Sequence, residues 1–212
     1  MKKQPKPISI AELRTLHKVK QDAIRKRLKE FALVQDSEYF YELVYCLLTP
    51  QSSAVNAEKA VQTLRLHDLF NCTIDPEPLL HQKDFYIRFH RTKAKHLLKV
   101  KEQFATIQQH LLNGNSSVEL RKWLVDNVTG LGWKEASHFL RNIGHRNLAI
   151  LDRHILRNLV RVGVLRQIPK TLTAKLYGTI EREFQRFSRK VNIPMDELDL
   201  LFWSMETGEI LK

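Results

Sequence analysis

The spacing of apolar residues constrains the fold most, because it follows the helical repeat along nearly the whole chain. No stretch keeps the strict alternation of apolar and polar residues that a half-buried strand requires. Glycine, which interrupts regular elements, occurs only 7 times in 212 residues. We therefore predict an all-α protein of roughly nine or ten helices with short connections.

Capping residues and helix breakers predict where these helices begin and end. Ser9 and Ser116 each stand three residues before a glutamate, the spacing of a capping box. In the first helix, apolar residues that include Leu16 and Val19 are expected to form one buried face. A loop with a short helix is expected over 71–90. The main helices are expected over 10–31, 38–48, 54–66, 93–112, 116–127, 133–143, 152–163, 173–191 and 194–207.

The charge balance is the first indication of function. The chain has 35 Lys and Arg against 23 Asp and Glu, a formal net charge of +12. Such a balance suits a regularly charged anionic partner, above all nucleic acid. A soluble protein with a lysine-rich surface explains the charge equally well. Charge alone therefore leaves both interpretations open.

Composition also argues against several classes of protein. Cys46 and Cys72 are the only cysteines, too few for a four-cysteine metal site or an iron–sulfur cluster. No run of about 18 apolar residues predicts a membrane span. The basic start MKKQPKPIS has no apolar segment behind it, unlike a signal peptide. We expect a cytoplasmic protein of prokaryotic type that associates with DNA and not with a membrane.

The segment from Asn127 to Ala136 carries the most specific local pattern. Gly130 and Gly132 flank Leu131 between two helical stretches, and both glycines can take positive φ. The second helix would then begin with free backbone N–H groups, which can hold a DNA phosphate irrespective of base sequence. An ordinary turn between two helices explains the glycines as well.

Lys134 gives this segment a possible chemical role. It lies on the first turn of the second helix, where a lysine faces the positive end of the helix dipole. Burial and neighbouring positive charge can bring the pKa of a catalytic lysine to ~7–8, and a neutral amine can form a Schiff base at a sugar C1′. Asp152 could steer that amine and stabilise a positive sugar. The simpler alternatives are phosphate binding for Lys134 and an N-cap for Asp152.

The hairpin, with Lys134 and an aspartate eighteen positions later, resembles the helix-hairpin-helix glycosylase superfamily. The strings GLGWKEASHFLRNIG and AILDRHILR are similar to the archaeal-type 8-oxoguanine DNA glycosylase/lyases, the second Ogg family. This resemblance implies two helical subdomains, one from 1–35 with 146–212 and the other from 36–145. It also implies an active site in the cleft between them, with Lys134 and Asp152 facing each other.

The resemblance implies further site residues. The terminal carboxylate of Lys212 would read the N1–H and exocyclic amine of 8-oxoguanine, and Trp203 would stack on the flipped base, with Phe89 on the opposite face of the pocket. A frayed terminus and a core tryptophan are the simpler alternatives for Lys212 and Trp203. Gln51, in Thr49-Pro-Gln-Ser-Ser53, would enter the gap left by that base, although Pro50 departs from the expected pattern. Arg153, His154 and the hairpin glycines Gly130 and Gly132 would contact DNA.

The implied function is excision of 8-oxoguanine through a lysine Schiff base, followed by β-elimination at the abasic site. We expect a monomer that acts on double-stranded DNA containing an oxidised purine and needs no metal or organic cofactor for this chemistry. In this superfamily, carbonyls near 126–131 can also hold a monovalent cation. Two alternatives stay open: a glycosylase/lyase for oxidised pyrimidines, and a non-catalytic helix-hairpin-helix module that binds DNA.

Overall fold

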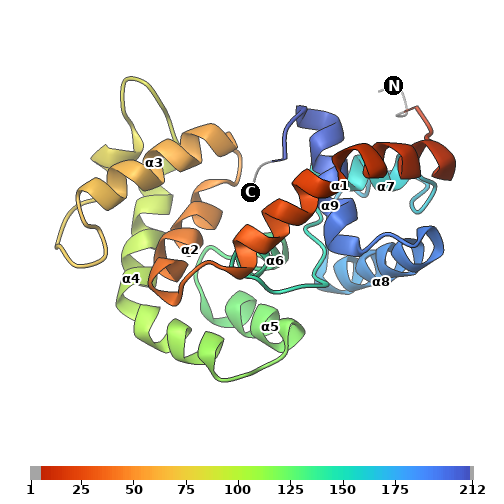
Figure 1. The fold of residues 1–212 in the computed structure, drawn as a ribbon. Coiled ribbons are helices and arrows are strands. Elements are labelled where there is room, and N and C mark those ends of the chain that lie inside the picture. Colours follow the sequence, from red (N-terminus) through yellow and green to blue (C-terminus); the bar gives the residue numbers. More distant parts are fainter. Residues whose placement is uncertain (1–5, 211–212) are drawn as a thin grey trace. The chain divides into compact units, whose positions relative to one another are not determined.

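The computed structural model describes residues 6–210, and the regular elements within that range are helices apart from one isolated bridge between His81 and Tyr86. The prediction of an all-α fold is confirmed. The helices are α1 (Ile10–Ala32), α2 (Tyr39–Leu48), α3 (Ala54–Leu66), α4 (His90–Leu112), α5 (Ser117–Asn127), α6 (Trp133–Asn142), α7 (Arg153–Arg161), α8 (Ala174–Val191) and α9 (Met195–Thr207), with short 3-10 turns η1 (Asp36–Glu38) and η2 (Pro78–Leu80) (Figure 1).

The chain divides into two compact units. Unit 1 combines Met1–Leu33 with Gly144–Lys212, and unit 2 is the continuous segment Val34–Ile143. The expected ranges, 1–35 with 146–212 and 36–145, differ from these units by two residues at each boundary. Unit 1 therefore joins segments from opposite ends of the sequence, whereas unit 2 is local in sequence.

Helix α2 lies at the centre of unit 2. Every residue from Phe40 to Leu48 is buried, and the helix packs against α3, α4 and α6. An all-round apolar helix has to be covered on every side, so its neighbours are arranged around it. The one acidic residue on this helix is Glu42. Its buried carboxylate accepts a hydrogen bond at 3.0 Å from Nδ2 of Asn142, which lies on α6.

Helix α9 has the corresponding place in unit 1, where it packs against α1, α7 and α8. Buried Glu197 of α9 accepts hydrogen bonds from His17 Nε2 at 2.6 Å and from Arg25 Nε at 3.1 Å, both of α1. The prediction that Leu16 and Val19 lie on the buried face of α1 is wrong, since they are 36% and 79% exposed. The face that meets α9 runs through Leu13, His17, Ile24, Leu28 and Phe31 instead.

Two element boundaries matter for the site, and one of them differs from the prediction. Helix α4 begins at His90, three residues earlier than expected, because Phe89 takes a left-handed conformation (φ 60°) and its carbonyl accepts the Lys93 N–H. Helix α2 ends at Leu48 as expected, yet Thr49 keeps a right-handed helical conformation before Pro50. The loop after α2 is therefore fixed by contacts other than the proline, which are described below.

Candidate active site

The turn between α5 and α6 has the predicted compact form. Val128 caps α5, its carbonyl accepts the Leu131 N–H at 3.2 Å, and the Leu131 side chain is buried. Gly130 takes positive φ (91°) as expected. Gly132 does not: it is the extended N-cap of α6, with φ −92° and ψ 179°. Of these two hairpin glycines, therefore, Gly130 is the one whose backbone conformation favours glycine.

Gly130 is also required by a close approach from α4. An ideal Cβ on Gly130 would lie 2.4 Å from Nδ1 of His96, well inside van der Waals contact. Burial lowers the pKa of His96, and the nearby charges of Lys99 and Lys93 lower it further. A neutral imidazole thus packs on the turn and joins α4 to the hairpin.

Arg121 fixes the start of α6 from the side of α5. Its Nη1 donates to Ser137 Oγ at 3.2 Å, and its guanidinium lies over the Trp133 ring at 5.1 Å from the centroid. Arg121 is almost fully buried. A planar cation can both donate and stack, so this residue holds the two hairpin helices in one geometry.

Lys134 lies on the first turn of α6, as predicted. Its side chain is one-quarter exposed, and its Nζ is 3.7 Å from Glu135 Oε1. The N-cap of α6 is Gly132, which has no side chain to cap the helix. The N-terminal end of α6 is therefore suited to an anion, and Lys134 beside it stays accessible to a small reactant.

Lys93, on the first turns of α4, is a residue that the sequence reasoning missed. Its Nζ donates to the carbonyl oxygens of Leu48 and Pro50, both at 2.7 Å, and to Ser52 Oγ at 3.4 Å. Burial lowers its pKa from 10.5 to about 8, with a further lowering by Lys134 and an opposing effect of Glu135. A signal was available, because Lys93 continues the buried stripe of Leu97, Val100 and Phe104.

The loop that carries Gln51 adjoins the segment that carries Phe89. Gln51 takes positive φ (57°) and is exposed, and Phe89 is 50% exposed with its own positive φ. Ser52 Oγ accepts the Arg88 N–H at 3.0 Å, which ties the two segments together. Two non-glycine residues in this strained region of backbone space are uncommon, and such strain often accompanies function.

Asp152, in unit 1, is the N-cap of α7. Its Oδ1 accepts the Ile155 N–H at 2.8 Å, and the residue is half-buried. The N-cap interpretation is therefore correct, and it leaves open a second role for the carboxylate. Arg153, the first residue of α7, is exposed. Lys134 belongs to unit 2 and Asp152 to unit 1, and each is fixed within its own unit.

His154 and Trp203 lie together in unit 1. Their rings meet edge to face with centroids 4.8 Å apart. Trp203 is half-buried, while Leu200, Leu201 and Phe202 beside it are fully buried. Its indole Nε1 has no hydrogen-bond partner among residues 6–210. Trp203 is thus only partly a core residue, and a polar atom of its ring lacks a protein acceptor.

Glu206 is the common partner of several polar side chains next to this aromatic pair. It was not identified from the sequence. It pairs with Arg157, lies 3.8 Å from His154 Nδ1 and accepts Asn158 Nδ2 at 3.3 Å. Arg157 and Asn158 follow His154 by three and four residues on α7, so all three share one face of the helix, and a single carboxylate contacts all of them. Lys212, expected to read the base, lies outside the described residues.

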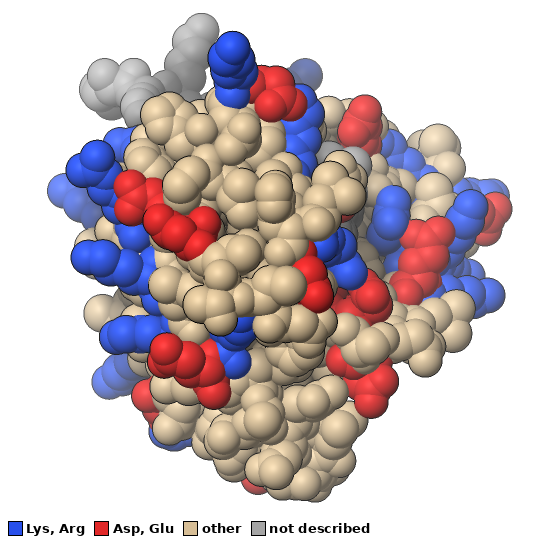
Figure 2. All heavy atoms as spheres, turned by 90° about the vertical axis from the view of Figure 1, so that its left-hand side faces the viewer, with Lys and Arg blue, Asp and Glu red and all other residues tan. Residues whose placement is uncertain are grey.

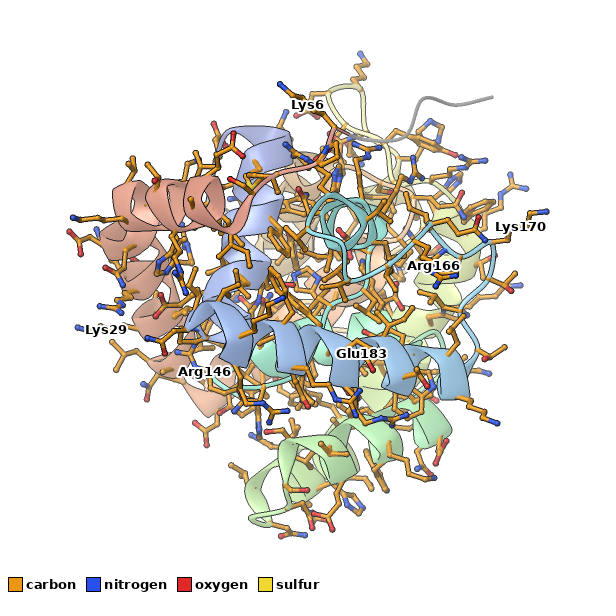
Figure 3. All side chains as sticks on the ribbon, turned by 90° about the vertical axis from the view of Figure 1, so that its right-hand side faces the viewer. Lys6, Lys29, Arg146, Arg166, Lys170 and Glu183 are labelled. Atoms are coloured by element: carbon orange, nitrogen blue, oxygen red, sulfur yellow. The ribbon has the colours of Figure 1, made fainter. Side chains whose placement is uncertain are left out.

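The basic residues are spread over the surface. On the face in Figure 2, Lys and Arg are interspersed with Asp and Glu and separated by broad neutral areas. Around unit 1, Lys6, Lys29 and Arg146 project from separate segments, and Arg166 and Lys170 lie on the loop between α7 and α8 (Figure 3). Among the described residues, no helix is long and apolar enough to cross a membrane.

Known proteins resemble this chain along nearly its full length. The family described as Ogg-HhH, 8-oxoguanine DNA glycosylase, matches residues 24–193. A protein of Fusobacterium nucleatum named 8-oxoguanine DNA glycosylase/AP lyase is 41% identical over 211 residues, covering 95% of this chain and 96% of the relative. A protein of the same name from Methanocaldococcus jannaschii is 36% identical over 195 residues, covering 90% and 92%.

Solved structures agree with these sequence matches. The 8-oxoguanine glycosylase/lyase of Methanocaldococcus jannaschii, in complex with a 15mer DNA containing 8-oxoguanine, superposes with a TM-score of 0.83 at 33% identity and covers 94% of this chain and 99% of its own. The 8-oxoguanine DNA glycosylase of Thermotoga maritima gives a TM-score of 0.83 at 28% identity, covering 96% and 98%.

Proposed function

This chain belongs to the family of 8-oxoguanine DNA glycosylases, and from that membership we propose how its residues carry out the reaction. The protein is an 8-oxoguanine DNA glycosylase with AP lyase activity. The observation that carries the proposed mechanism is Lys134 on the uncapped first turn of α6, directly after the Gly130 turn. Lys134 and Asp152, each fixed within its own unit, are proposed to act on the same nucleotide.

DNA is bound through its phosphates. The N-terminal end of α6 holds one phosphate next to Lys134, and exposed Arg153 contacts another together with His154. Such contacts read no base, so the protein can scan duplex DNA of any sequence. It acts as a monomer on DNA in the cytoplasm.

The damaged nucleotide leaves the stack before it reacts, at a cost of a few kcal/mol. Gln51, exposed on its strained loop, fills the vacated space and offers an amide to the opposite base. Trp203 stacks on the extruded base, and Phe89 covers its other face. The terminal carboxylate of Lys212 accepts N1–H and the exocyclic amine, a pattern that an oxidised thymine cannot match.

Lys134 is the nucleophile. Its neutral amine attacks C1′, the bond from C1′ to N9 breaks, and the base leaves with the electron pair and takes up a proton. Asp152 stabilises the positive charge that develops on the sugar. The amine then loses a proton as the ring opens to a Schiff base. Loss of a 2′ proton expels the 3′ phosphate by β-elimination, and hydrolysis of the Schiff base frees Lys134.

Borohydride trapping tests this mechanism. The wild-type protein mixed with an 8-oxoguanine duplex and borohydride should give a covalent adduct, and Lys134→Gln should give none while still binding the duplex. Lys122→Gln is the matched control, since Lys122 is an exposed lysine of α5 in the same unit. Absence of a wild-type adduct would leave only a DNA-binding module, and an adduct with Lys134→Gln would mean that another amine is the nucleophile.

A second comparison tests base recognition. A chain extended beyond Lys212 should excise 8-oxoguanine poorly yet still cut a preformed abasic site, because the extension moves the carboxylate and leaves Lys134 intact. Equal excision by the extended and native chains would remove Lys212 from the recognition. Faster excision of an oxidised pyrimidine than of 8-oxoguanine by the native chain would overturn the substrate assignment.

A further inference from the structure

Lys93 is a buried lysine of unit 2 that the mechanism above does not use. It is 6% exposed, and it lies on the apolar face of α4, where a charged side chain has to be paired or hydrogen-bonded. Its three acceptors lie at the end of α2 or directly after it: they are the Leu48 and Pro50 carbonyls and Ser52 Oγ. Lys93 thus bridges parts of the chain that are 45 residues apart.

These contacts fix the shape of the loop around Gln51. The Leu48 carbonyl belongs to the open C-terminal end of α2, and the Pro50 carbonyl directly precedes Gln51. Because the ammonium binds both carbonyls, it fixes the backbone on either side of Thr49 and next to Gln51, which has a left-handed conformation. Ser52, which also contacts the ammonium, accepts the N–H of Arg88, the neighbour of Phe89. Lys93 is therefore linked by hydrogen bonds to both segments, the one with Gln51 and the one with Phe89.

Charges at the start of α6 also act on Lys93. Lys134 lowers its pKa, and Glu135 raises it. On α4 itself, the charge of Lys93 lowers the pKa of His96. The segment from Thr49 to Ser53 has no titratable side chain. The loop is therefore held by hydrogen bonds from Lys93 to neutral acceptors.

We propose that Lys93 is a positioning residue for base excision, which fixes the loop that carries Gln51. The proposal rests on the proposed role of Gln51, which fills the space left by the extruded base. The contacts of Lys93 keep Gln51 aligned with that space. Lys93 itself touches neither the base nor the sugar in this assignment.

The test compares Lys93→Met with Lys95→Met. Lys95 is exposed on the same helix and is the matched control. Single-turnover excision of 8-oxoguanine at saturating protein should fall on the order of 10-fold or more in Lys93→Met. Cleavage of a preformed abasic site, which requires no base to leave the stack, should fall much less. Lys95→Met should keep the wild-type rate on both substrates. Equal rates for the two variants, or an equal loss by Lys93→Met on both substrates, would overturn the proposal.

Lys93→Arg separates charge from geometry, and it decides the matter if Lys93→Met does not fold. Arginine keeps the positive charge and the donors, but its planar fork cannot reproduce the compact three-point contact. We expect slower excision than in the wild type, with cleavage of a preformed abasic site affected much less. A wild-type excision rate would show that the geometry of the contact is irrelevant, and an equal loss on both substrates would show a general disturbance of the fold. Either outcome overturns the proposal.

Failure of this inference can be told apart from failure of the proposed function. If Lys134→Gln still forms the borohydride adduct, the nucleophile is misassigned whatever Lys93 does. If Lys134→Gln forms no adduct and Lys93→Met reacts like Lys95→Met, the nucleophile stands and only the role of Lys93 is wrong.

Discussion

The imidazole of His96 occupies the space that a side chain at Gly130 would need, since an ideal Cβ there would lie 2.4 Å from its Nδ1. The positive φ of Gly130 and the approach of α4 are thus two separate requirements for glycine at one position. Any side chain at residue 130 has to disturb the turn that precedes Lys134.

Gly130→Ala should therefore destabilise the protein by about 2–3 kcal/mol, from backbone strain and from displacement of His96. Gly114→Ala is the matched control, because Gly114 has φ 71° but no atom within 4 Å of an added Cβ. It should cost only about 1 kcal/mol. Urea unfolding measures both variants. His96→Ala in the Gly130→Ala background should recover the steric part, and equal costs for the two glycines would contradict the close packing.

Asp152→Asn should slow base excision strongly. The urea concentration at which the variant unfolds should be the same as for the wild type. Asparagine caps a helix as well as aspartate does, so the Ile155 N–H keeps its acceptor, but the negative charge is lost. Asp152→Ala should in addition cost about 1 kcal/mol of stability.

Thr173→Ala provides the control for that cap. Thr173 accepts the Leu176 N–H at the start of α8 in the same unit. Its loss should cost a comparable stability without changing the excision rate. Unchanged turnover in Asp152→Asn would remove Asp152 from the mechanism and leave it as a cap only.

Glu197→Gln should destabilise unit 1 by about 2–4 kcal/mol, because it removes the buried acceptor charge that His17 and Arg25 share. Glu183→Gln is the control, since Glu183 pairs with Arg186 on the exposed surface of α8 (Figure 3). That variant should stay within about 0.5 kcal/mol of the wild type. Thermal or urea unfolding compares the two, and equal effects would mean that the pair between α1 and α9 adds nothing to stability.

The stability of the protein should depend on pH through Lys93. Its pKa is about 8 in the folded chain and has an ordinary value of 10.5. Between these values the unfolded chain binds a proton that the folded chain has released, so the free energy of unfolding rises with pH in that window. The difference between wild type and Lys93→Met should grow in favour of the wild type as the pH rises from 8 towards 10.5. A constant or shrinking difference would show that the pKa of Lys93 is not lowered.

Local features could be predicted from the sequence because they depend on neighbouring residues. The capping boxes at Ser9 and Ser116, the cap at Asp152 and the start of α6 just before Lys134 all follow from spacings of a few residues. The backbone of Gly132 could not be predicted, because glycine fits an extended N-cap as readily as a left-handed turn.

Features that depend on distant partners could not be predicted in this way. Nothing within a few residues of Lys93 indicates that its ammonium caps α2, and nothing near Phe89 predicts its left-handed conformation. The burial of His17 and the exposure of Val19 depend on where α9 packs, about 180 residues away along the chain. Periodicity predicts that α1 has an apolar face, but the packing partner determines which residues belong to it.

The pairing of α1 with α9 has a consequence for the order in which the protein can assemble during synthesis. The ribosome makes α1 well before the helix that covers its apolar face, Met195–Thr207. The helices of the segment Val34–Ile143 lie between them in the sequence and find their partners within that segment. The nascent chain therefore has to carry the uncovered face of α1 until α9 has been synthesised.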